Sequence, residues 1–428
     1  MTQSIYNMGS VVLVAIDIAK ARNDVLVQFP DGAKRKFKVA NKLADYQEFT
    51  SYLKSLDLPC LIGFEATGNY HRPLAYYLES EGFALRQVSS LAAAKTREAL
   101  YNSWDKNDSK DAQVILHMLK TGVSQTYCDP MIHNFNEIQE LSKAYYQVSL
   151  RKVRVQHSMM THYLPLYFPE AQKYFHSSRA EWFSNFLLRF PVPASVIKHS
   201  KGQFISDAWD TVGRKVSKTA WLTDFYETAH HSIGLPVVED SEAVRMFRLI
   251  LQEHIDLCKM RQQIEQQADR YMGDNEDYHR LQTIPGIGPI TALTVLAETG
   301  DIRRFSHHKK FLKYCGLNLS TERSGRFRGI TKLSKRGNSR LRLAFWLAAT
   351  VAIRMRENTF RQKYENYIKS DPSNKDLKRK AYTAVAAKMA RVAYSVIKTN
   401  IDYRCFYEAA IPSGKIPSPR AVEASLTS

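Results

Sequence analysis

The 428-residue sequence contains little cysteine. Its five cysteines are odd in number, lie far apart and include no CxxC pair: Cys60, Cys128, Cys258, Cys315 and Cys405. This pattern excludes a disulfide framework and argues against a zinc knuckle, because both need closely spaced or paired cysteines. We therefore expect reduced thiols.

Long apolar runs are also missing. The run at residues 11–16 has the length of a buried strand and is far too short to span a bilayer. The first residues lack the charged, apolar and small-residue order of a signal peptide. With 44% hydrophobic residues, the composition is that of a globular protein. We expect an intracellular, cytoplasmic protein with no membrane partner.

Acidic residues are scarce relative to basic ones, with 42 Asp and Glu against 61 Lys and Arg and a net charge of +19. Such an excess suits a polyanionic partner, although many basic proteins only have solvated basic faces. The distribution is more informative. Residues 303–342 contain thirteen Lys or Arg and one acid, Glu322. This concentration favours a surface that faces phosphates.

The first 120 residues have the pattern of an α/β domain. Apolar or alternating segments predict strands, and helical spacing predicts the segments between them. The predicted strands are 11–16, 25–29, 37–39, 60–64 and 84–88, and the predicted helices are 43–56, 73–79 and a third from 91. Three strands in a meander followed by alternating helix and strand indicate an RNase H-like fold. The rest of the chain is expected to be mostly α-helical.

Four acidic residues are candidates for a metal site. Asp17 and Glu65 end two predicted buried strands, and ligands of open α/β sheets gather at such carboxyl ends. Asp108 and Asp111 are three residues apart and would share one helix face. Converging carboxylates bind divalent cations, and two such ions stabilise both oxygens of a phosphoryl displacement. Two structural alternatives remain: Asp108 with Asp111 also suits a helix N-cap, and Asp17 and Glu65 also suit arginine pairs.

The middle of the chain carries helical patterns and little chemistry. Residues 176–237 are less regular and are predicted to form a small inserted module. Residues 244–268 carry an apolar stripe at roughly heptad spacing, which indicates a coiled-coil-like spacer or a dimerising arm. His254 lies in that stripe and is expected to be a tolerated polar position and not a ligand.

Residues 281–292 have the form of a helix-hairpin-helix. Gly286 and Gly288 permit a tight turn, which would offer backbone N–H groups and a helix N-terminus to a phosphate. The alternative is a plain helical turn used in packing. Two long helices, 339–369 and 376–400, are predicted to follow.

Ser324 stands next to a glycine in an arginine-rich segment that we expect to form a loop. A serine hydroxyl is a weak nucleophile unless activated, so a phosphate-binding or turn role is the usual one for such a residue. No histidine adjoins it, which leaves a Ser-His-Asp mechanism unsupported. The expected phosphate contacts come from basic residues of this region: Arg323, Arg326, Arg328, Lys335 and Arg336.

Several ordered motifs together resemble one family. Residues 15–20, 64–70 and 107–112 are similar to the three acidic motifs of the DEDD insertion-sequence transposases. The C-terminal signature of that family resembles residues 284–288, 315–317, 324–325 and 334–338. The family includes bridge-RNA-guided recombinases and Piv-like DNA invertases.

The resemblance implies a domain order. A RuvC-like catalytic domain would cover residues 1–125, and a helical or coiled-coil spacer with the insertion at 176–237 would cover 126–275. A transposase domain at 276–410 and a flexible tail at 411–428 would follow. The insertion makes the middle longer than in compact members.

The resemblance also implies a mechanism. Asp17, Glu65, Asp108 and Asp111 would bind Mg²⁺, and Ser324 would form a covalent link to a DNA phosphate. Donor and target DNA would be selected by a structured noncoding RNA, and the enzyme would act as a homo-oligomer. Residues 326–327 depart from the small residues expected after Ser-Gly. A DNA invertase, a RuvC-like hydrolytic nuclease and a binding module without catalysis remain the alternatives.

Overall fold

The computed structural model describes residues 11–102, 108–129, 136–176, 180–213, 217–321, 323–324, 327–356 and 358–404. The side chains of residues 108, 109, 180, 323, 324, 327 and 328 are not described. The chain divides into two compact units, Met1–His133 and Asn134–Ser428, and each unit is described by itself.

A six-stranded sheet forms the centre of the first unit, in the order β3-β2-β1-β4-β5-β6. Its strands are β1 (Val12–Asp17), β2 (Arg22–Gln28), β3 (Lys34–Ala40), β4 (Cys60–Glu65), β5 (Ala84–Val88) and β6 (Gln125–Thr126). β1, β2 and β3 form an antiparallel meander, and β4 and β5 run parallel to β1. β6 adds a short antiparallel edge. This order confirms the predicted RNase H-like fold.

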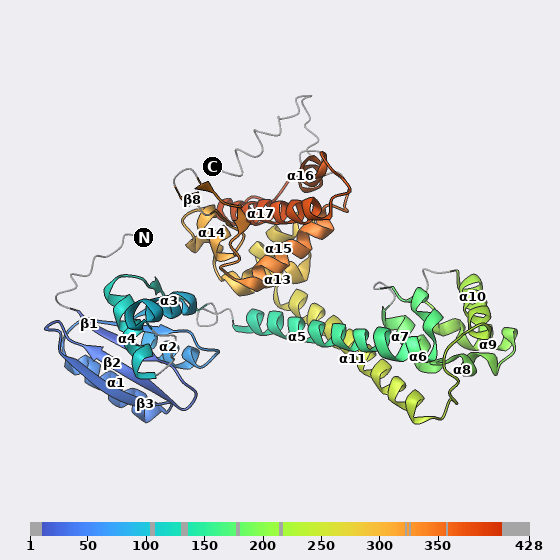
Figure 1. The fold of residues 1–428 in the computed structure, drawn as a ribbon, viewed down its shortest axis with the longest axis horizontal. Helices are drawn as coiled ribbons and strands as arrows, with labels where there is room; N and C mark the ends of the chain where they lie inside the picture. The colour runs from blue at the N-terminus through green and yellow to red at the C-terminus, as the bar shows by residue number, and fades with distance from the viewer. Residues whose placement is uncertain are drawn as a thin grey trace. The chain divides into compact units, whose positions relative to one another are not determined.

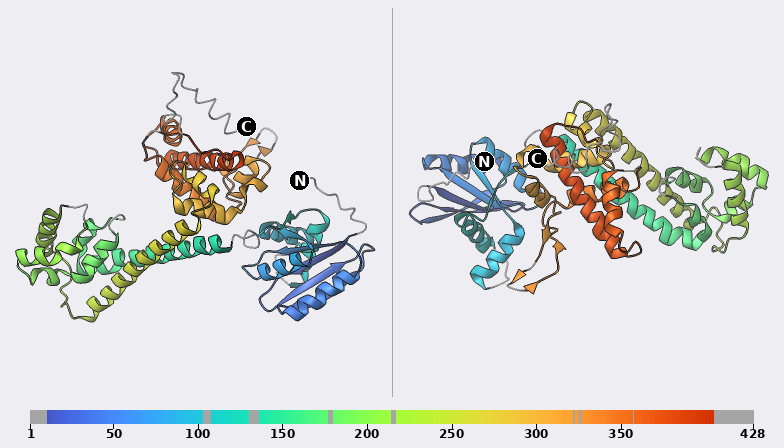
Figure 2. Two further views of the ribbon diagram at one scale, coloured as in Figure 1. Left: turned by 180° about the vertical axis from the view of Figure 1, so that it is seen from behind. Right: turned by 90° about the horizontal axis from the view of Figure 1, so that it is seen from above.

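Helices cover both faces of the sheet because the side chains of β1 alternate between two cores. Val12, Val14 and Ile16 pack under α1 (Leu43–Ser55) and α2 (His71–Ser80). Leu13 and Ala15 face the other way, toward α3 (Ser90–Tyr101) and α4 (Asp108–Lys120). Figure 1 and the left-hand view of Figure 2 show α3 and α4 on one side of the sheet and α1 on the other.

The strands β2 and β3 begin earlier than the sequence predicted, at Arg22 and Lys34 instead of residues 25 and 37. Their hairpin keeps its register to both ends, from Arg22 opposite Ala40 to Gln28 opposite Lys34. Backbone pairing extends the strands although the end residues are polar, because β3 is the edge of the sheet and its side chains are largely exposed.

In the second unit, α5 (Asn136–Ser158) and α11 (Glu242–Tyr271) lie side by side (Figures 1 and 2). The Tyr145 hydroxyl donates to Glu265 at 3.0 Å, and Val148 and Val155 of α5 share a buried cluster with residues of α11. The predicted apolar stripe of 244–268 therefore packs against another helix of the same chain along part of its length.

A compact helical module lies between α5 and α11 in the sequence. It contains η3 (Met159–Tyr163), α6 (Leu164–Tyr167), η4 (Pro169–Tyr174), α7 (Ala180–Arg189), α8 (Pro193–Ile197), α9 (Lys201–Ala208), η6 (Trp209–Thr211) and α10 (Lys218–His230). Its buried core is rich in aromatic rings, with Phe186 in contact with Phe204, Trp221 and Phe225. The region predicted as an insertion therefore has a hydrophobic core of its own, which continues into the start of α11.

The C-terminal core of this unit is built on α17 (Lys375–Thr399), whose small and apolar residues are buried. Around it lie α12 (Glu276–Gln282), α13 (Pro289–Thr299), η7 (Ile302–Arg304), α14 (His308–Tyr314), α15 (Ser339–Ala352) and α16 (Thr359–Ile368). Short strands β7 (Leu319–Ser320), β8 (Arg323–Ser324), β9 (Phe327–Arg328) and β10 (Lys332–Leu333) precede α15. Within the described parts of the chain, no helix is long and apolar enough to cross a membrane.

The prediction of one helix over residues 339–369 is wrong, because α15 ends at Ala352 and α16 begins after Asn358. The buried Asn358 side chain accepts hydrogen bonds from the backbone N–H groups of Phe360 and Arg361. An asparagine that caps a new helix competes with continuation of the old one.

Candidate functional site

Asp17 and Glu65 end neighbouring parallel strands on the same face of the sheet. Ile16 of β1 is paired with Phe64 of β4, so the two carboxylates occupy the next position of the same register. Ile16 and Phe64 belong to the core under α1 and α2. Because side chains alternate along a strand, Asp17 and Glu65 point to the opposite face, which α3 and α4 cover.

Helix α4 brings Asp111 to that face. The neighbouring Ala112 packs in the same core as Leu13 and Ala15 of β1, so this turn of the helix lies against the sheet. Gly63 of β4 permits this close approach because it has no side chain. A Cβ atom at this position would lie 2.5 Å from a methyl carbon of Leu119 in α4. Asp108 starts α4, but its side chain lies outside the described residues.

The Asp111 carboxylate is nearly buried and forms an ion pair with Arg97 of α3. The Nε of Arg97 donates to Oδ1 of Asp111 at 2.7 Å, and Nη2 contacts the same oxygen. The two side chains are 13% and 5% exposed. A guanidinium therefore partly neutralises one of the four predicted metal ligands. Sequence reasoning missed Arg97, because nothing local to residue 97 indicates its distant partner.

Asp24 of β2 is a further carboxylate on this face. It pairs directly with Asp17 across the antiparallel β1–β2 ladder, which places their Cβ atoms about 4.5–5.5 Å apart. The sequence contained a signal for it, since Asp24 directly precedes the apolar Val25 and Leu26, but the strand was predicted to begin only at residue 25.

Carboxylate oxygens are the ligands that Mg²⁺ prefers. Asp17 and Glu65 share one sheet face with Asp24, and α4 carries Asp111 toward it. The described residues nevertheless contain no group of three or more His, Cys, Asp or Glu already arranged to hold a metal ion. The donor chemistry and the shared face fit a divalent cation, and Asp111 would have to exchange part of its contact with Arg97 for the ion.

Ser324 lies in the second unit, in a short antiparallel ribbon. β8 pairs with β9 so that Ser324 stands opposite Phe327, and β7 pairs with β10 further along the chain. The backbone at Ser324 is therefore extended, where the sequence predicted a loop. The side chains of Arg323, Ser324 and Arg328, and the whole of Arg326, lie outside the described residues.

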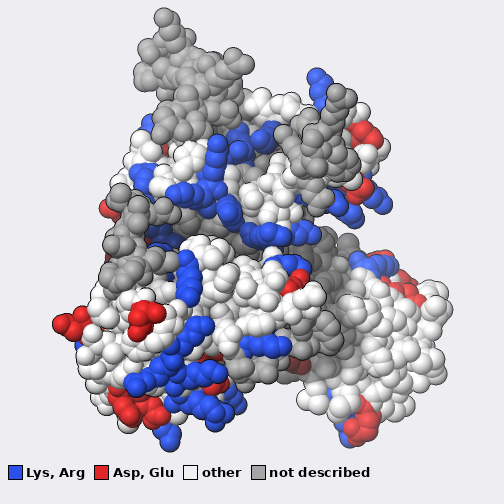
Figure 3. All heavy atoms as spheres, turned by 60° about the vertical axis from the view of Figure 1, so that its left-hand side comes forward, with Lys and Arg blue, Asp and Glu red and all other residues white. Residues whose placement is uncertain are grey.

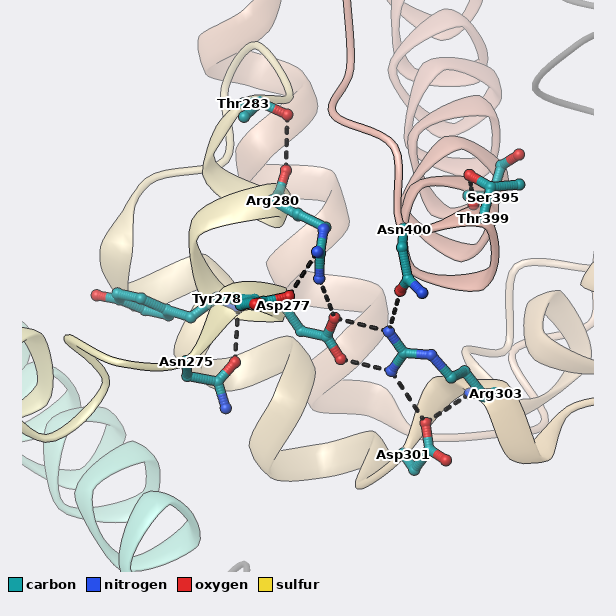
Figure 4. Close-up of polar contacts among 11 residues, drawn as sticks. Asn275, Asp277, Tyr278, Arg280, Thr283, Asp301, Arg303, Ser395, Thr399 and Asn400 are labelled. Atoms are coloured by element: carbon teal, nitrogen blue, oxygen red, sulfur yellow. Dashed lines mark hydrogen bonds and ion pairs between the residues drawn. The ribbon is translucent and has the colours of Figure 1, made fainter.

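Among the described basic residues between 303 and 342, Arg303, Arg304 and Arg340 make contacts that stabilise the fold. Arg340 pairs with Glu298 at 2.5 Å, and Arg304 lies over the rings of Phe305 and Tyr314. Arg303 has a larger role, shown in Figure 4. By contrast, Lys335 and Arg336 are exposed, as expected for phosphate contacts.

Figure 4 shows how Arg303 connects three elements of the C-terminal core. Its two Nη atoms donate to the Asp277 carboxylate of α12 at 2.6 and 2.9 Å, and one of them donates to the Asn400 side chain. The hydrogen bonds to Asp277 raise the pKa of the guanidinium. Asn400 ends α17 in a left-handed conformation, with φ of 56°. This network joins α12, η7 and the end of α17.

Residues 281–292, predicted as a helix-hairpin-helix, form the end of α12, a turn and the start of α13, and their two glycines have different roles. Gly286 has φ of +89°, and a Cβ there would lie 2.3 Å from the Ala348 carbonyl oxygen of α15. Gly286 is therefore required by packing, which is the alternative that the sequence left open. Nothing lies within 4 Å of a Cβ built on Gly288, at the N-cap of α13, so the turn has open space at this position.

The motifs at 315–317 and 334–338 meet in the fold. A Cβ on Gly337 would lie 2.5 Å from the Gly316 nitrogen and the Tyr314 carbonyl oxygen. Asn338 donates its backbone N–H to that carbonyl at 2.7 Å and caps α15 with its side chain. These two motifs close the base of the ribbon that carries Ser324.

Comparison with known families matches two separate parts of the chain. The family model of the IS110-type DEDD transposases matches residues 14–169, and that of the IS116/IS110/IS902 transposase family matches residues 278–365. The chain belongs to the IS110-type DEDD transposase family. The first range contains all four predicted acidic ligands of this IS110-type protein, and the second contains Ser324.

The relatives of this IS110-type protein are named as transposases. The transposase of insertion sequence element IS1111A from Coxiella burnetii is 31% identical over 178 residues, which are 40% of this chain and 48% of that protein. The IS1328 transposase of Yersinia enterocolitica is 29% identical over 36% of this chain and 45% of its own length. The chain thus spans about half the length of these two relatives.

A mini-circle putative transposase for IS117 from Streptomyces coelicolor is 24% identical over 74% of this chain and 78% of its own length. Among solved structures, T. thermophilus RuvC in complex with a Holliday junction substrate matches with a TM-score of 0.20 and 10% identity. That match covers 27% of this chain and 99% of RuvC. A score this low adds nothing to the strand order described above.

Proposed function

We propose that this protein is a DNA transposase that cuts DNA strands and rejoins them to new partners. One observation carries the proposal: Asp17 and Glu65 end adjacent strands on the sheet face that α4 covers, and α4 also carries Asp108 and Asp111. Carboxylates carried by three elements that meet at one sheet face suit phosphoryl transfer, which depends on charge stabilisation. Family membership supports the same conclusion.

Asp17, Glu65, Asp108 and Asp111 are the proposed Mg²⁺ ligands. When bound, the ion would stabilise negative charge on the oxygens of the scissile phosphate. The protein's part is to hold the carboxylates at the sheet face and to keep Asp111 in place through Arg97. Asp24, opposite Asp17, adds negative charge that favours a cation at this position.

Ser324 is the proposed nucleophile. Its Oγ would attack the phosphorus of a DNA phosphodiester, forming a serine–phosphate bond while one strand oxygen leaves and takes up a proton. A carboxylate or bound water would receive the serine proton. Attack on the same phosphorus by a hydroxyl of a second DNA strand would then release the serine. Each step exchanges one phosphodiester for another, so no external energy source is needed.

The proposed partners are double-stranded donor and target DNA and a structured noncoding RNA that selects both. A homo-oligomer in the bacterial cytoplasm would bring the carboxylates and Ser324 to one phosphate, from the same or from different copies of the chain. The basic composition, with a net charge of +19, supports nucleic-acid partners.

The covalent step is tested with the full-length chain, Mg²⁺, labelled DNA carrying the ends of its own element and RNA transcribed from the element's noncoding region. Wild type should form a protein–DNA adduct that resists detergent, and Ser324→Ala should not. Ser320→Ala, at an exposed serine of the preceding strand β7, is the matched control and should retain the adduct. An adduct of unchanged yield in Ser324→Ala would overturn the serine mechanism.

The metal site is tested with Asp17→Asn, against Asp31→Asn in the exposed turn between β2 and β3. Asp17→Asn should abolish strand cleavage in Mg²⁺, and Asp31→Asn should not. Cleaved DNA without joined products, persisting in Ser324→Ala, would indicate a hydrolytic nuclease. Inverted segments as the main product would indicate an invertase. Binding without any metal-dependent cleavage would indicate a module without catalysis.

A further inference from the structure

The edge strand β3 places three lysines on the same sheet face as the candidate metal site. Lys34, Lys36 and Lys38 alternate with Arg35 and Phe37, so the lysines share one face. Phe37 packs against the core under α1 and α2, which sends the three lysines to the opposite face, the one that α4 covers. All three are exposed.

The register aligns these lysines with the carboxylates. Lys38 pairs with Asp24 of β2, and Asp24 pairs with Asp17 of β1. These residues form one row across the sheet, so the Cα atoms of Lys38 and Asp17 are about 10 Å apart at two strand spacings. Lys36 and Lys34 lie about 7 and 14 Å from this row along β3. Because β3 runs in the same direction as β1, they extend away from the carboxyl end of β1.

A hollow joins the lysines to helix α4. A pocket of about 300 Å³ is lined by Lys36 and Lys38 of β3, by Asp24 and Leu26 of β2, and by Ala112 of α4. Ala112 directly follows the candidate ligand Asp111. The lysines therefore flank an open recess that reaches the helix of the carboxylate site.

We propose that Lys34, Lys36 and Lys38 bind the phosphate backbone of the DNA strand whose scissile phosphate lies at Asp17 and Glu65. The inference rests on the proposed function, because it takes the carboxylate row as the place of reaction. The row of lysines is about 14 Å long. This length matches about four phosphates of one strand, which are spaced by about 3.4 Å along the duplex axis.

DNA is favoured as the occupant because Lys38 continues the row of Asp17 and Asp24 on the next strand of the same sheet. A strand that leaves the metal site across β2 reaches Lys38 next. The carboxylates themselves repel phosphate, so positive charge about 10 Å away is needed to hold the strand against that repulsion. Figure 3, which draws one face of the molecule, shows lysines and arginines gathered in patches between stretches of uncharged surface.

Lysines on an edge strand also prevent edge-to-edge pairing of sheets, so the experiment must separate the two roles. Protection against pairing needs charge of either sign, whereas DNA binding needs positive charge. Arg35 provides the matched control, since it lies on the same strand and points to the opposite face, where it contacts the Tyr52 hydroxyl at 3.1 Å.

The experiment measures binding of the full-length chain to a labelled duplex of 40 base pairs as a function of salt. Lys36→Gln with Lys38→Gln should lower the slope of log affinity against log salt by about 2, because each lost phosphate contact removes about 0.9. The affinity gap to wild type should shrink about tenfold between about 50 and 200 mM salt. Arg35→Gln should leave the slope unchanged. Lys36→Glu with Lys38→Glu should weaken binding further without causing aggregation.

A structured RNA of equal charge is the second probe. A loss confined to RNA would overturn the assignment to DNA. An unchanged DNA slope together with new aggregation of the glutamine variant would assign the lysines to edge protection alone. If instead Asp17→Asn and Ser324→Ala fail to affect chemistry while the salt slope falls as predicted, the proposed function fails and the binding surface stands.

Discussion

The ion pair between Arg97 and Asp111 allows a prediction with a defined magnitude. Arg97→Gln removes the guanidinium and leaves a carboxylate that is only 5% exposed without its charged partner. Breaking a buried pair by removing one member costs about 3–5 kcal/mol. Because the total stability of a domain is about 5–15 kcal/mol, the first unit should lose a large part of its free energy of unfolding.

Lys95→Gln is the matched control in the same helix. Lys95 pairs with Glu98, but the two side chains are 69% and 52% exposed. An exposed pair of this kind contributes less than about 1 kcal/mol, so Lys95→Gln should be nearly neutral. Hydrogen exchange of β1 and β4 peptides in the full-length chain, followed by mass spectrometry at increasing urea, reports the unfolding free energy of this unit alone.

The same variant distinguishes a structural carboxylate from a metal ligand. If Asp111 binds a cation, Mg²⁺ should replace the lost guanidinium and restore stability to Arg97→Gln, by about 2.7 kcal/mol when its concentration is 100 times the dissociation constant. The double variant Arg97→Gln with Asp111→Asn should not respond to Mg²⁺. Equal stability of Arg97→Gln and Lys95→Gln, or a Mg²⁺ response that survives in the double variant, would refute the reasoning.

Three further predictions concern packing, pH and the C-terminal core. Gly63→Ala should cost about 1–3 kcal/mol and push α4 off the sheet, because its Cβ would meet Leu119 at 2.5 Å; thermal melting and Mg²⁺-dependent cleavage should both decline. Burial lowers the pKa of His254, hydrogen-bonded to Ser184 at 2.9 Å, to about 4. Its folded pKa lies below the unfolded value, so the stability contribution should be complete above about pH 6.5, fall by about 3 kcal/mol between pH 6.5 and 4 and level off below 4, with a flatter profile in His254→Leu. Asp277→Asn removes the acceptor charge from the network of Figure 4 and should lower the melting temperature of the second unit without changing the salt slope of DNA binding.

The sequence predicted the RNase H-like unit well because its central strands β1 and β4 are buried on both faces and appear as apolar runs. β1 and β4 end where the acids begin, so Asp17 and Glu65 were identifiable from local pattern. The starts of β2 and β3 were not, since exposed polar residues extend those strands through backbone pairing alone. Asp24 was missed for the same reason.

Contacts between distant residues explain the other differences. The buried side chain of Asn358 caps α16 and so separates it from α15. Nothing in the local sequence distinguishes this asparagine from any other. Gly286 suits a phosphate-binding turn equally well in sequence, and only the approach of Ala348 shows that packing requires it. The inserted module keeps its own aromatic core, which the scattered tryptophans and prolines of that region indicated only weakly.

The candidate site combines two opposite electrostatic requirements in one sheet. Asp17 and Asp24 face each other across a ladder, an arrangement that destabilises a sheet unless positive charge is near. In a chain of net charge +19, this local excess of acidic side chains is the position at which a divalent cation has the most favourable electrostatic interaction. DNA needs the reverse, a positive surface. Lys38 at the end of the same row and Lys36 behind it satisfy that need without neutralising the metal ligands, because they stand one strand beyond Asp24 at the exposed edge. On this view the meander of β1, β2 and β3 positions the scissile phosphate as well as supporting the fold, and substitutions on β3 should alter DNA placement while the unit remains folded.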